Sequence, residues 1–306
     1  MADSQDQDNT GLGVHQAARL EKLKKIESLG LDPWGARFDN RIFNGPIREM
    51  ANQVQFKQED GSLVPLPDLD ASRLPGAEPI DYKAWKASQG AGEEIGPVVR
   101  VAGRIMLLRT AGKLYFLNIR DWTGDIQIMI AKGQVPDADF DLAKLLDFGD
   151  LVGVDGRLGR TNTGELTVIA TRLHFMTKTL EPPPEKHAGL QDAELRQRMR
   201  YVDLTYNPES LQTFLKRTKI IHSIRSTLAS HQFVEVEGPT LHTIAGGAAA
   251  KPFVTHHNAL DMQLFLRIAL ELHLKRLLVV ALNAFTKWGE SIAMKGSAPS
   301  TTQSSP

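Results

Sequence analysis

The fold of this chain is decided by residues 98–133, which read VVRVAGRIMLLRTAGKLYFLNIRDWTGDIQIMIAKG. Three runs rich in β-branched and aromatic residues are broken at Ala111-Gly112 and at Thr123-Gly124, two turn dipeptides at hairpin spacing. Residues 137–146 have apolar residues at helical spacing, and residues 150–176 add two strands that turn within 160–164. Three strands, a helix and two strands, with glycines where a strand must bend, predict a five-stranded OB barrel.

The composition is that of a globular protein, with 306 residues of which 42% are hydrophobic and 24% are charged. The formal net charge is zero, so contacts with nucleic acid would need local patches rather than a long-range field. The absence of cysteine excludes disulfides, thiolate metal ligands and cysteine nucleophiles. The acidic N-terminus is not a secretory signal, and no apolar run approaches the roughly 20 residues of a membrane span. We expect a soluble, cytoplasmic protein without a membrane segment.

Two segments precede the predicted barrel, after a polar stretch at 1–13 that we expect to be disordered. The N-terminal extension, 14–50, begins with a basic amphipathic helix at 14–29. That helix either packs one stripe on the body of the protein or makes an accessory RNA contact. Residues 51–97 are rich in proline, glycine and acidic side chains without a sustained period, which predicts an inserted or mobile connection with a short helix near 82–87.

The C-terminal part changes character after the barrel at 98–178. A proline-rich linker is predicted at 179–206, and 207–279 has a helix, then a strand within 232–241, then a helix with a leucine stripe. The Gly246-Gly247 pair either brings backbone close to a ligand or is an ordinary turn. His256 and His257 would point to opposite faces of a strand, so the sequence predicts no metal site.

Candidate nucleic-acid contacts lie on the barrel. The open face of the first three strands of an OB barrel binds single-stranded nucleic acid with aromatic rings and polar groups. The residues placed there are Arg104, Phe116, Gln127 and, at the last turn, Glu165. Each of them alone could equally be part of an ordinary barrel, with Phe116 as a core residue. Glu271, near the start of the last helix, is either a ligand group or a carboxylate favoured by the helix dipole.

Three strings resemble the family of class II lysine-tRNA ligases. FVEVEGPTLHTIAGGAAAKPFVTHHNALDMQLFLRIALELHLKRLL at 233–278 is similar to the start of its catalytic domain. VAGRIMLLRTAGKLYFLNIRDWTGDIQIMI at 101–130 resembles its anticodon-binding barrel, and GLQDAELRQRMRYVDL at 189–204 resembles its joint. The resemblance runs from about residue 19 to residue 279. It implies an α+β multidomain fold: an N-terminal helix, a five-stranded OB barrel and an incomplete class II synthetase antiparallel α/β catalytic domain.

The resemblance also implies a reaction, in which lysine is activated with ATP and Mg²⁺ and then transferred to tRNA(Lys). Phe116 would stack on an anticodon base, while Arg104, Gln127 and Glu165 would read or position its neighbours. Gly247 would offer backbone to the α-amino group of lysine, and Glu271 would pair with the same ammonium. The family's homodimer interface would include Phe214, Ile221 and Pro239.

Two departures from the family put catalysis in doubt. Leu270 stands where the family has proline, and after Val279 the family's second signature, acidic Mg²⁺ ligands and later arginine are absent. Synonymous codons for 280–306, read from the third base, spell GFERVYEMGRIYRNEGISTKHNPEFT, which resembles that second signature. The single codons of Trp288 and Met294 force the glycine and the glutamate that the family requires. We therefore expect 280–306 to be a frameshifted, aberrant tail and the 306-residue chain to be inactive.

Three functions remain open from the sequence. The chain represents a lysine-tRNA ligase that lacks part of its catalytic domain, or it is a tRNA-binding module without catalysis, or it is a structural or partner-binding paralogue. In each case the partial catalytic domain should expose apolar surface, because its other strands are missing. The barrel, in contrast, should be complete and able to fold alone.

Overall fold

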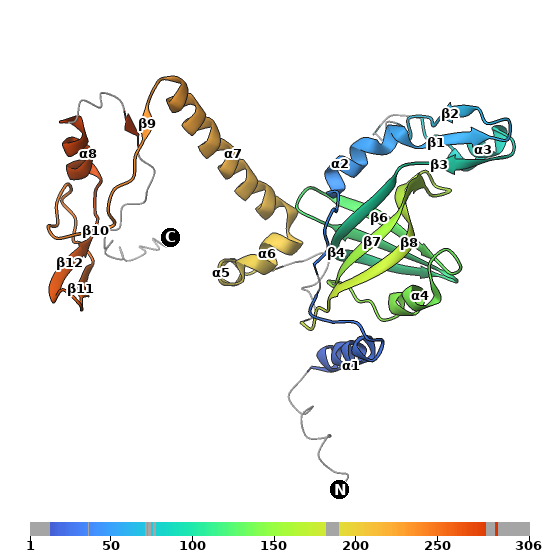
Figure 1. Ribbon diagram of the computed structural model, residues 1–306, viewed down its shortest axis with the longest axis horizontal. Coiled ribbons are helices and arrows are strands. Elements are labelled where there is room, and N and C mark those ends of the chain that lie inside the picture. Colours follow the sequence, from blue (N-terminus) through green and yellow to red (C-terminus); the bar gives the residue numbers. More distant parts are fainter. Residues whose placement is uncertain are drawn as a thin grey trace, which may run out of the picture. The chain divides into compact units, whose positions relative to one another are not determined.

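The computed structural model describes residues 13–35, 37–70, 72, 75, 78–181, 190–279 and 285–286 (Figure 1). The chain divides into two compact units, Met1–Ala188 and Gly189–Pro306. The predicted disordered segment 1–13 lies outside the described residues except for Gly13. The predicted tail 280–306 lies outside them except for Phe285–Thr286, as does the middle of the predicted linker.

A closed five-stranded barrel forms the centre of the first unit (Figure 1). Its strands are β4 (Val98–Ala111), β5 (Leu114–Arg120), β6 (Asp125–Ala131), β7 (Leu151–Arg160) and β8 (Leu166–Thr177), in the order β4-β5-β6-β8-β7. β6 and β8 pair in parallel, and the other pairs are antiparallel. Helix α4 (Asp137–Ala143) lies between the third and fourth strands and is shorter than the predicted 137–146. The predicted order of three strands, a helix and two strands is confirmed.

Alternation along β5 and β6 contributes to the barrel core. On β5 and β6, Leu117, Ile119, Ile126 and Ile128 are buried, while the residues between them face outward. The hairpin between β4 and β5 turns at Gly112, whose φ of 61° lies in the left-handed region that glycine adopts without strain. The inward residues therefore hold the barrel together, and the outward residues of the same strands are available for binding.

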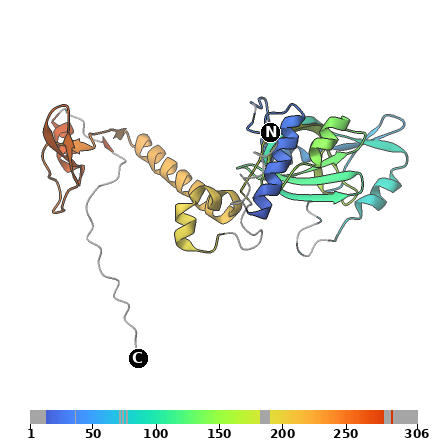
Figure 2. The same ribbon diagram turned by 90° about the horizontal axis from the view of Figure 1, so that it is seen from below.

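Helix α1 (Val14–Ser28) packs on the barrel unit, with Leu23 and Ile26 buried (Figure 2). Its basic residues Arg19 and Lys22 bond to barrel residues, which favours the packing interpretation over an accessory RNA contact. α2 (Asn44–Glu49) and the short 3₁₀ helix η1 (Met50–Gln53) follow. Asn44 is fully buried and its amide donates to the carbonyls of Ile119 and Gly124, which fixes α2 to the β5–β6 hairpin.

The segment 51–97 corrects the sequence prediction. The segment was predicted to be an inserted or mobile connection with one short helix, but its described part also contains a sheet: β1 (Gln55–Gln58), β2 (Leu63–Pro65) and β3 (Gly92–Ile95) are antiparallel in the order β2-β1-β3. The short helix was predicted correctly and is α3 (Tyr82–Ser88). The strands were missed because three or four residues are too few to show a period, and because β1 pairs with β3 across a long stretch of chain.

The second unit contains short strands and one long helix. Its helices are α5 (Ala193–Arg198), α6 (Arg200–Tyr206), α7 (Pro208–Ser230) and α8 (Glu271–Leu278). β10 (Leu241–His242), β12 (Met262–Leu266) and β11 (Val254–His257) form one sheet, and β9 (Val234–Glu235) pairs in parallel with β13 (Phe285–Thr286). The strand predicted within 232–241 is therefore shorter than expected, since β9 has only two residues.

Few apolar side chains of the second unit are buried. Among its described residues, only Leu264 and Ile268 belong to the buried hydrophobic set. On α7, Phe214, Ile220 and Ile224 are exposed. This agrees with the predicted exposure of apolar surface. No helix in the described part of the chain is long and apolar enough to cross a membrane.

Candidate nucleic-acid interface and candidate amino-acid site

Three of the four predicted nucleic-acid contacts meet in one pocket of about 330 Å³ on the barrel face. Phe116 comes from β5, Gln127 from β6 and Glu165 from the turn between β7 and β8. The remaining lining residues are Leu107, Arg109, Leu117, Asn118 and Thr163. The first three barrel strands and the β7–β8 turn therefore build a single site.

Phe116 lies on the outward face of β5 and is half-buried, so it is not a core residue. The guanidinium carbon of Arg109 lies 6.0 Å from the centre of the Phe116 ring. An aromatic ring next to a cation on an open barrel face is suited to stacking on a nucleic-acid base near its phosphate.

The Gln127 amide is oriented by its neighbours. Its Nε2 donates to Thr167 Oγ1 over 2.9 Å, and its Oε1 accepts from Arg109 Nη2 over 3.4 Å. Thr167 Oγ1 in turn donates to the backbone carbonyl of Glu165 over 2.9 Å. The polar groups of β6 and of the β7–β8 turn are thus linked through one threonine, which restricts how each can move.

Asn118 is a site residue that the sequence prediction missed. It lies two residues after Phe116 on the same face of β5 and opposite Gln127 on β6. Its Oδ1 is buried and accepts no hydrogen bond. An unsatisfied buried acceptor costs about 1–3 kcal/mol. Spacing from Phe116 was a signal that could have identified it.

Arg109 was also missed, for a different reason. The ladder between β4 and β5 shifts register between Ile105 and Leu107. Beyond this irregularity, Arg109 lies opposite Phe116. An extra residue in one strand changes which side chains share a face, and nothing in the local sequence marks where it occurs.

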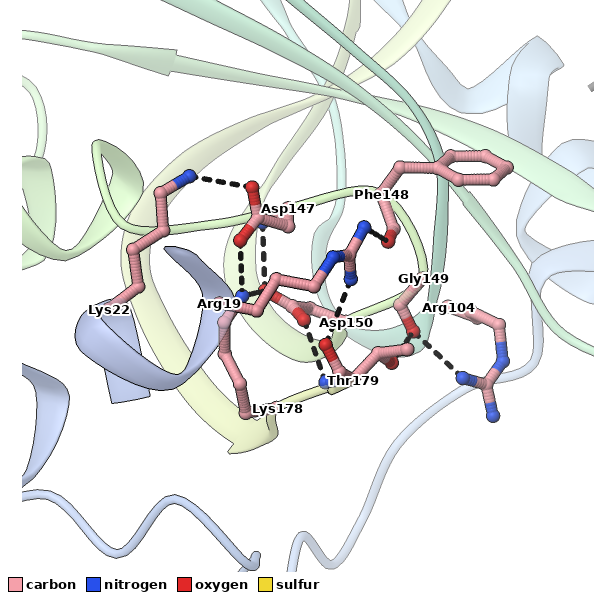
Figure 3. Close-up of polar contacts among 9 residues, drawn as sticks. All are labelled: Arg19, Lys22, Arg104, Asp147, Phe148, Gly149, Asp150, Lys178 and Thr179. Carbon is pink, nitrogen blue, oxygen red and sulfur yellow. Dashed lines mark hydrogen bonds and ion pairs between the residues drawn. The ribbon is translucent and has the colours of Figure 1, made fainter. Parts of the chain in front are cut away.

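Arg104 does not reach the pocket. It lies opposite Arg120 at the other end of the β4–β5 ladder, and its Nη1 donates to the Gly149 carbonyl over 2.7 Å. The expectation that Arg104 reads or positions a base is therefore not supported by its place in the fold. It belongs instead to the polar cluster that joins helix α1 to the barrel (Figure 3).

That cluster is centred on a buried ion pair, in which Lys178 Nζ lies 2.6 Å from Asp150 Oδ2 (Figure 3). Lys178 also lies 2.7 Å from Asp147, and Lys22 of α1 approaches the other oxygen of Asp147 to 2.6 Å. Arg19 of α1 donates to the carbonyls of Thr179 and Phe148. Burial alone would raise the pKa of Asp147, but the hydrogen bonds from the two lysines hold it below its ordinary value.

Gly247 and Glu271, the two residues predicted for an amino-acid site, lie near each other in the second unit. Gly247 has φ of 89°, and a Cβ built on it would lie 3.0 Å from the Cβ of Ala269 and 3.5 Å from that of Glu271. Glu271 is the first residue of α8, directly after Leu270, and its carboxylate is paired with Lys275 one turn later. The half-buried turn at Gly247 thus lies close to the base of the Glu271 side chain.

The residues predicted for a dimer interface lie at the surface of the second unit. Phe214 and Pro239 are exposed and Ile221 is half-buried, and the Phe214 ring lies 5.1 Å from the Arg200 guanidinium. His256 pairs with Asp261 over 3.2 Å. Among the described residues, no three His, Cys, Asp or Glu side chains are grouped as metal ligands.

Comparison with known proteins identifies both units. Residues 99–175 match the OB-fold nucleic acid binding domain, and residues 192–286 match the tRNA synthetases class II (D, K and N). Lysine–tRNA ligases from Staphylococcus aureus strains Mu3, Mu50 and N315 are each 41% identical to the chain over 278 residues. That alignment covers 91% of this chain and 50% of each relative, so the chain spans half the length of the curated relatives it matches.

The protein therefore carries the nucleic-acid-binding barrel and part of the catalytic domain of a class II tRNA synthetase. Within that class it is a homologue of the lysine–tRNA ligases. The resemblance drawn from the sequence is confirmed at this level.

Proposed function

We propose that the barrel binds the anticodon of tRNA(Lys), as part of a ligase that joins lysine to this tRNA. The observation that carries the proposal is the pocket in which Phe116, Asn118, Gln127 and Glu165 lie together beside Arg109. Proteins commonly bind unpaired RNA bases with an aromatic ring that stacks on the base and with hydrogen-bonding groups around it. Because the net charge of the chain is zero, affinity should depend on local contacts such as those in this pocket.

The polar groups of the pocket suit uracil. Its pairing edge has one N–H donor between two carbonyl acceptors. The Glu165 carboxylate can accept from an N–H, and the amide and guanidinium groups of the pocket can donate to the carbonyls. The lysine codon AAA pairs with the anticodon UUU, which is consistent with this selection.

The experiment measures binding of the 306-residue chain to an RNA stem-loop with the loop triplet UUU, and to the same stem-loop with GGG. We expect the UUU stem-loop to bind more tightly, with affinity that falls as salt rises. Equal affinity for the two RNAs would reject anticodon reading and favour the partner-binding paralogue.

For the second unit we propose a lysine-ammonium site between the Gly247 backbone and Glu271, and a homodimer that uses the exposed side of α7. The proximity of Gly247 and Glu271 supports the first, and the exposure of Phe214 and Ile224 supports the second. In this proposal, the ammonium group of a bound lysine molecule replaces Lys275 as the partner of the Glu271 carboxylate, so the carboxylate remains paired. Sedimentation of the purified chain tests the dimer.

Catalysis is a separate proposal. Adenylate formation requires groups that neutralise phosphate and align the lysine carboxylate with it. Such a set is not recognisable among the 306 residues, so we propose that this chain alone does not catalyse lysine-dependent pyrophosphate exchange with ATP and Mg²⁺. Exchange above background would disprove this.

The tail 280–306 is proposed to be the second signature read out of frame. Support comes from the glycine and glutamate that the single codons of Trp288 and Met294 force in the shifted frame. Sequencing the parent locus decides the matter, because an intact frame without the shifted signature would exclude it.

A further inference from the structure

The turn between β7 and β8 supplies one wall of the nucleic-acid pocket through Thr163 and Glu165. Within the turn, Gly164 N donates to the Thr161 carbonyl over 2.8 Å, and Thr161 N donates to the Glu165 carbonyl over 3.0 Å. Gly164 has φ of 76°, a conformation that few residues other than glycine adopt. The backbone at Gly164 therefore determines where the two side chains point.

Arg160 fixes the backbone at Gly164 through a hydrogen bond. Its side chain is only 5% exposed, and its Nη1 donates to the Gly164 carbonyl over 2.9 Å. Its Nη2 lies 3.1 Å from Oδ2 of Asp70, and its Nη1 lies 3.4 Å from Oδ1. Asp70 belongs to the segment 51–97, so a residue outside the barrel pairs with the arginine that supports the turn.

The same segment contacts the turn at two more places. Glu94 on β3 accepts from the backbone N–H of Arg160 and, over 2.6 Å, from the Tyr82 hydroxyl. Burial, reinforced by Glu94, raises the pKa of Tyr82, which keeps the hydroxyl a donor. A Cβ built on Gly164 would lie 3.2 Å from Leu69 and 3.5 Å from Tyr82, so the segment lies directly against the turn.

We propose that the segment 51–97 positions the β7–β8 turn for nucleic-acid binding. Asp70, acting through Arg160 and the Gly164 carbonyl, is its principal positioning residue, and it holds Thr163 and Glu165 toward the base. This inference rests on the proposed function of the pocket. It gives the segment, which the sequence suggested to be only a connection, a role in selectivity.

The proposal makes a prediction opposite in sign to simple electrostatics. Removing a negative charge near an RNA site ordinarily strengthens binding, since fewer anions repel the phosphates. Under the proposal, Asp70→Asn weakens binding, because Arg160 loses its ionic partner and the turn loses its fixed conformation. The sign of the change therefore separates positioning from a general charge effect.

The matched control is Glu93→Gln. Glu93 is exposed on β3 next to Glu94, and its replacement removes the same charge from the same segment without touching Arg160. Asp70→Glu keeps the charge and serves as the rescue variant. All are made in the full 306-residue chain and measured with the UUU stem-loop.

We expect Asp70→Asn to weaken binding about three- to tenfold, a fraction of what a lost base-edge hydrogen bond costs. Glu93→Gln should bind as tightly as the unmodified chain or more tightly, and Asp70→Glu should recover most of the loss. In a Glu165→Ala background Asp70→Asn should have little further effect, because it acts through that turn. Amide hydrogen exchange at Gly164 and Glu165 should be faster in Asp70→Asn without RNA.

Three results would count against the inference. Unchanged or tighter binding by Asp70→Asn, with Phe116→Ala still weakening binding, would remove the positioning role and leave the proposed function in place. If Phe116→Ala and the UUU-to-GGG change were both without effect, the proposed function itself would fail, and the inference with it. Unchanged exchange at Gly164 in Asp70→Asn would also count against positioning.

Discussion

Lys178 Nζ lies 2.6 Å from Asp150 Oδ2, and neither side chain is exposed to solvent. Asp150 also accepts from the backbone N–H groups of Thr179 and Asp147, so its carboxylate is satisfied on all sides. A fully bonded buried pair of this kind contributes little compared with apolar residues, but breaking it leaves an uncompensated charge. The pair should therefore act chiefly by joining the end of β8 to the loop before β7.

Lys178→Met tests this joint. We expect the free energy of unfolding to fall by about 3–5 kcal/mol in urea titration, because Asp150 would remain buried without its cation. Lys178→Met combined with Asp150→Leu should recover part of the loss. If Lys178→Met were as stable as the unmodified chain, the ion pair would not have the proposed structural role.

The pair formed by Lys22 and Asp147 should make docking of α1 depend on pH. Asp147 has a pKa held below its ordinary 3.8, so its contribution to stability is present above that value and is lost as the pH falls through the lower folded pKa. Asp147→Asn should cost about 1.5–3 kcal/mol at neutral pH, and the difference should shrink in acid. Urea titrations at several pH values measure it.

The control is Asp141→Asn, whose carboxylate pairs with Lys144 on the exposed side of α4. Exposed pairs contribute roughly 0–1 kcal/mol, so this variant should differ little from the unmodified chain at any pH. A similar pH dependence in both variants would show that Asp147 has no special role.

Phe116→Ala tests stacking in the pocket. Base–aromatic stacking contributes roughly 1–3 kcal/mol per base, so affinity for the UUU stem-loop should fall by about five- to 150-fold. Trp122→Ala is the control, since Trp122 is an exposed aromatic at the β5–β6 hairpin that does not line the pocket. Equal losses of RNA affinity in the two variants would mean that Phe116 has no specific role in base stacking.

Gly247→Ala tests the candidate amino-acid site. At φ of 89° an alanine costs about 1–2 kcal/mol, and its Cβ would meet Ala269 beside Glu271. We expect lower stability of the second unit and weaker protection of its amides by lysine. Gly246→Ala is the matched control, because its Cβ would meet only the end of the Leu272 side chain, 3.0 Å away. Identical behaviour of the two variants would argue against a special conformation at Gly247.

The barrel was predictable because its information is local. Leu117 and Ile119 alternate with Phe116 and Asn118, and glycine marks the β4–β5 turn, so a window of a few residues reveals strand, face and hairpin. Phe116 and Gln127 could be placed on the open face for the same reason. The small sheet within 51–97 could not be predicted from the sequence, because β1 pairs with β3 far along the chain and neither strand is long enough to show a pattern.

The sequence could predict site residues only where the register between neighbouring strands is regular. Arg104 was assigned to the pocket because it occupies the first strand, but the irregularity between Ile105 and Leu107 makes Arg109 the residue opposite Phe116. The support of Gly164 by Asp70 joins residues far apart in sequence through Arg160. Contacts of this kind depend on the completed fold.

The alternation along β5 has a consequence for how this module can change. Leu117 and Ile119 maintain the closed barrel, while their neighbours Phe116 and Asn118 face the pocket. Mutations at the outward positions can therefore alter which base is preferred without disturbing the hydrophobic interior. A barrel organised in this way is a practical scaffold for redesigning RNA specificity, and it leaves natural selection the same freedom to retune recognition one side chain at a time.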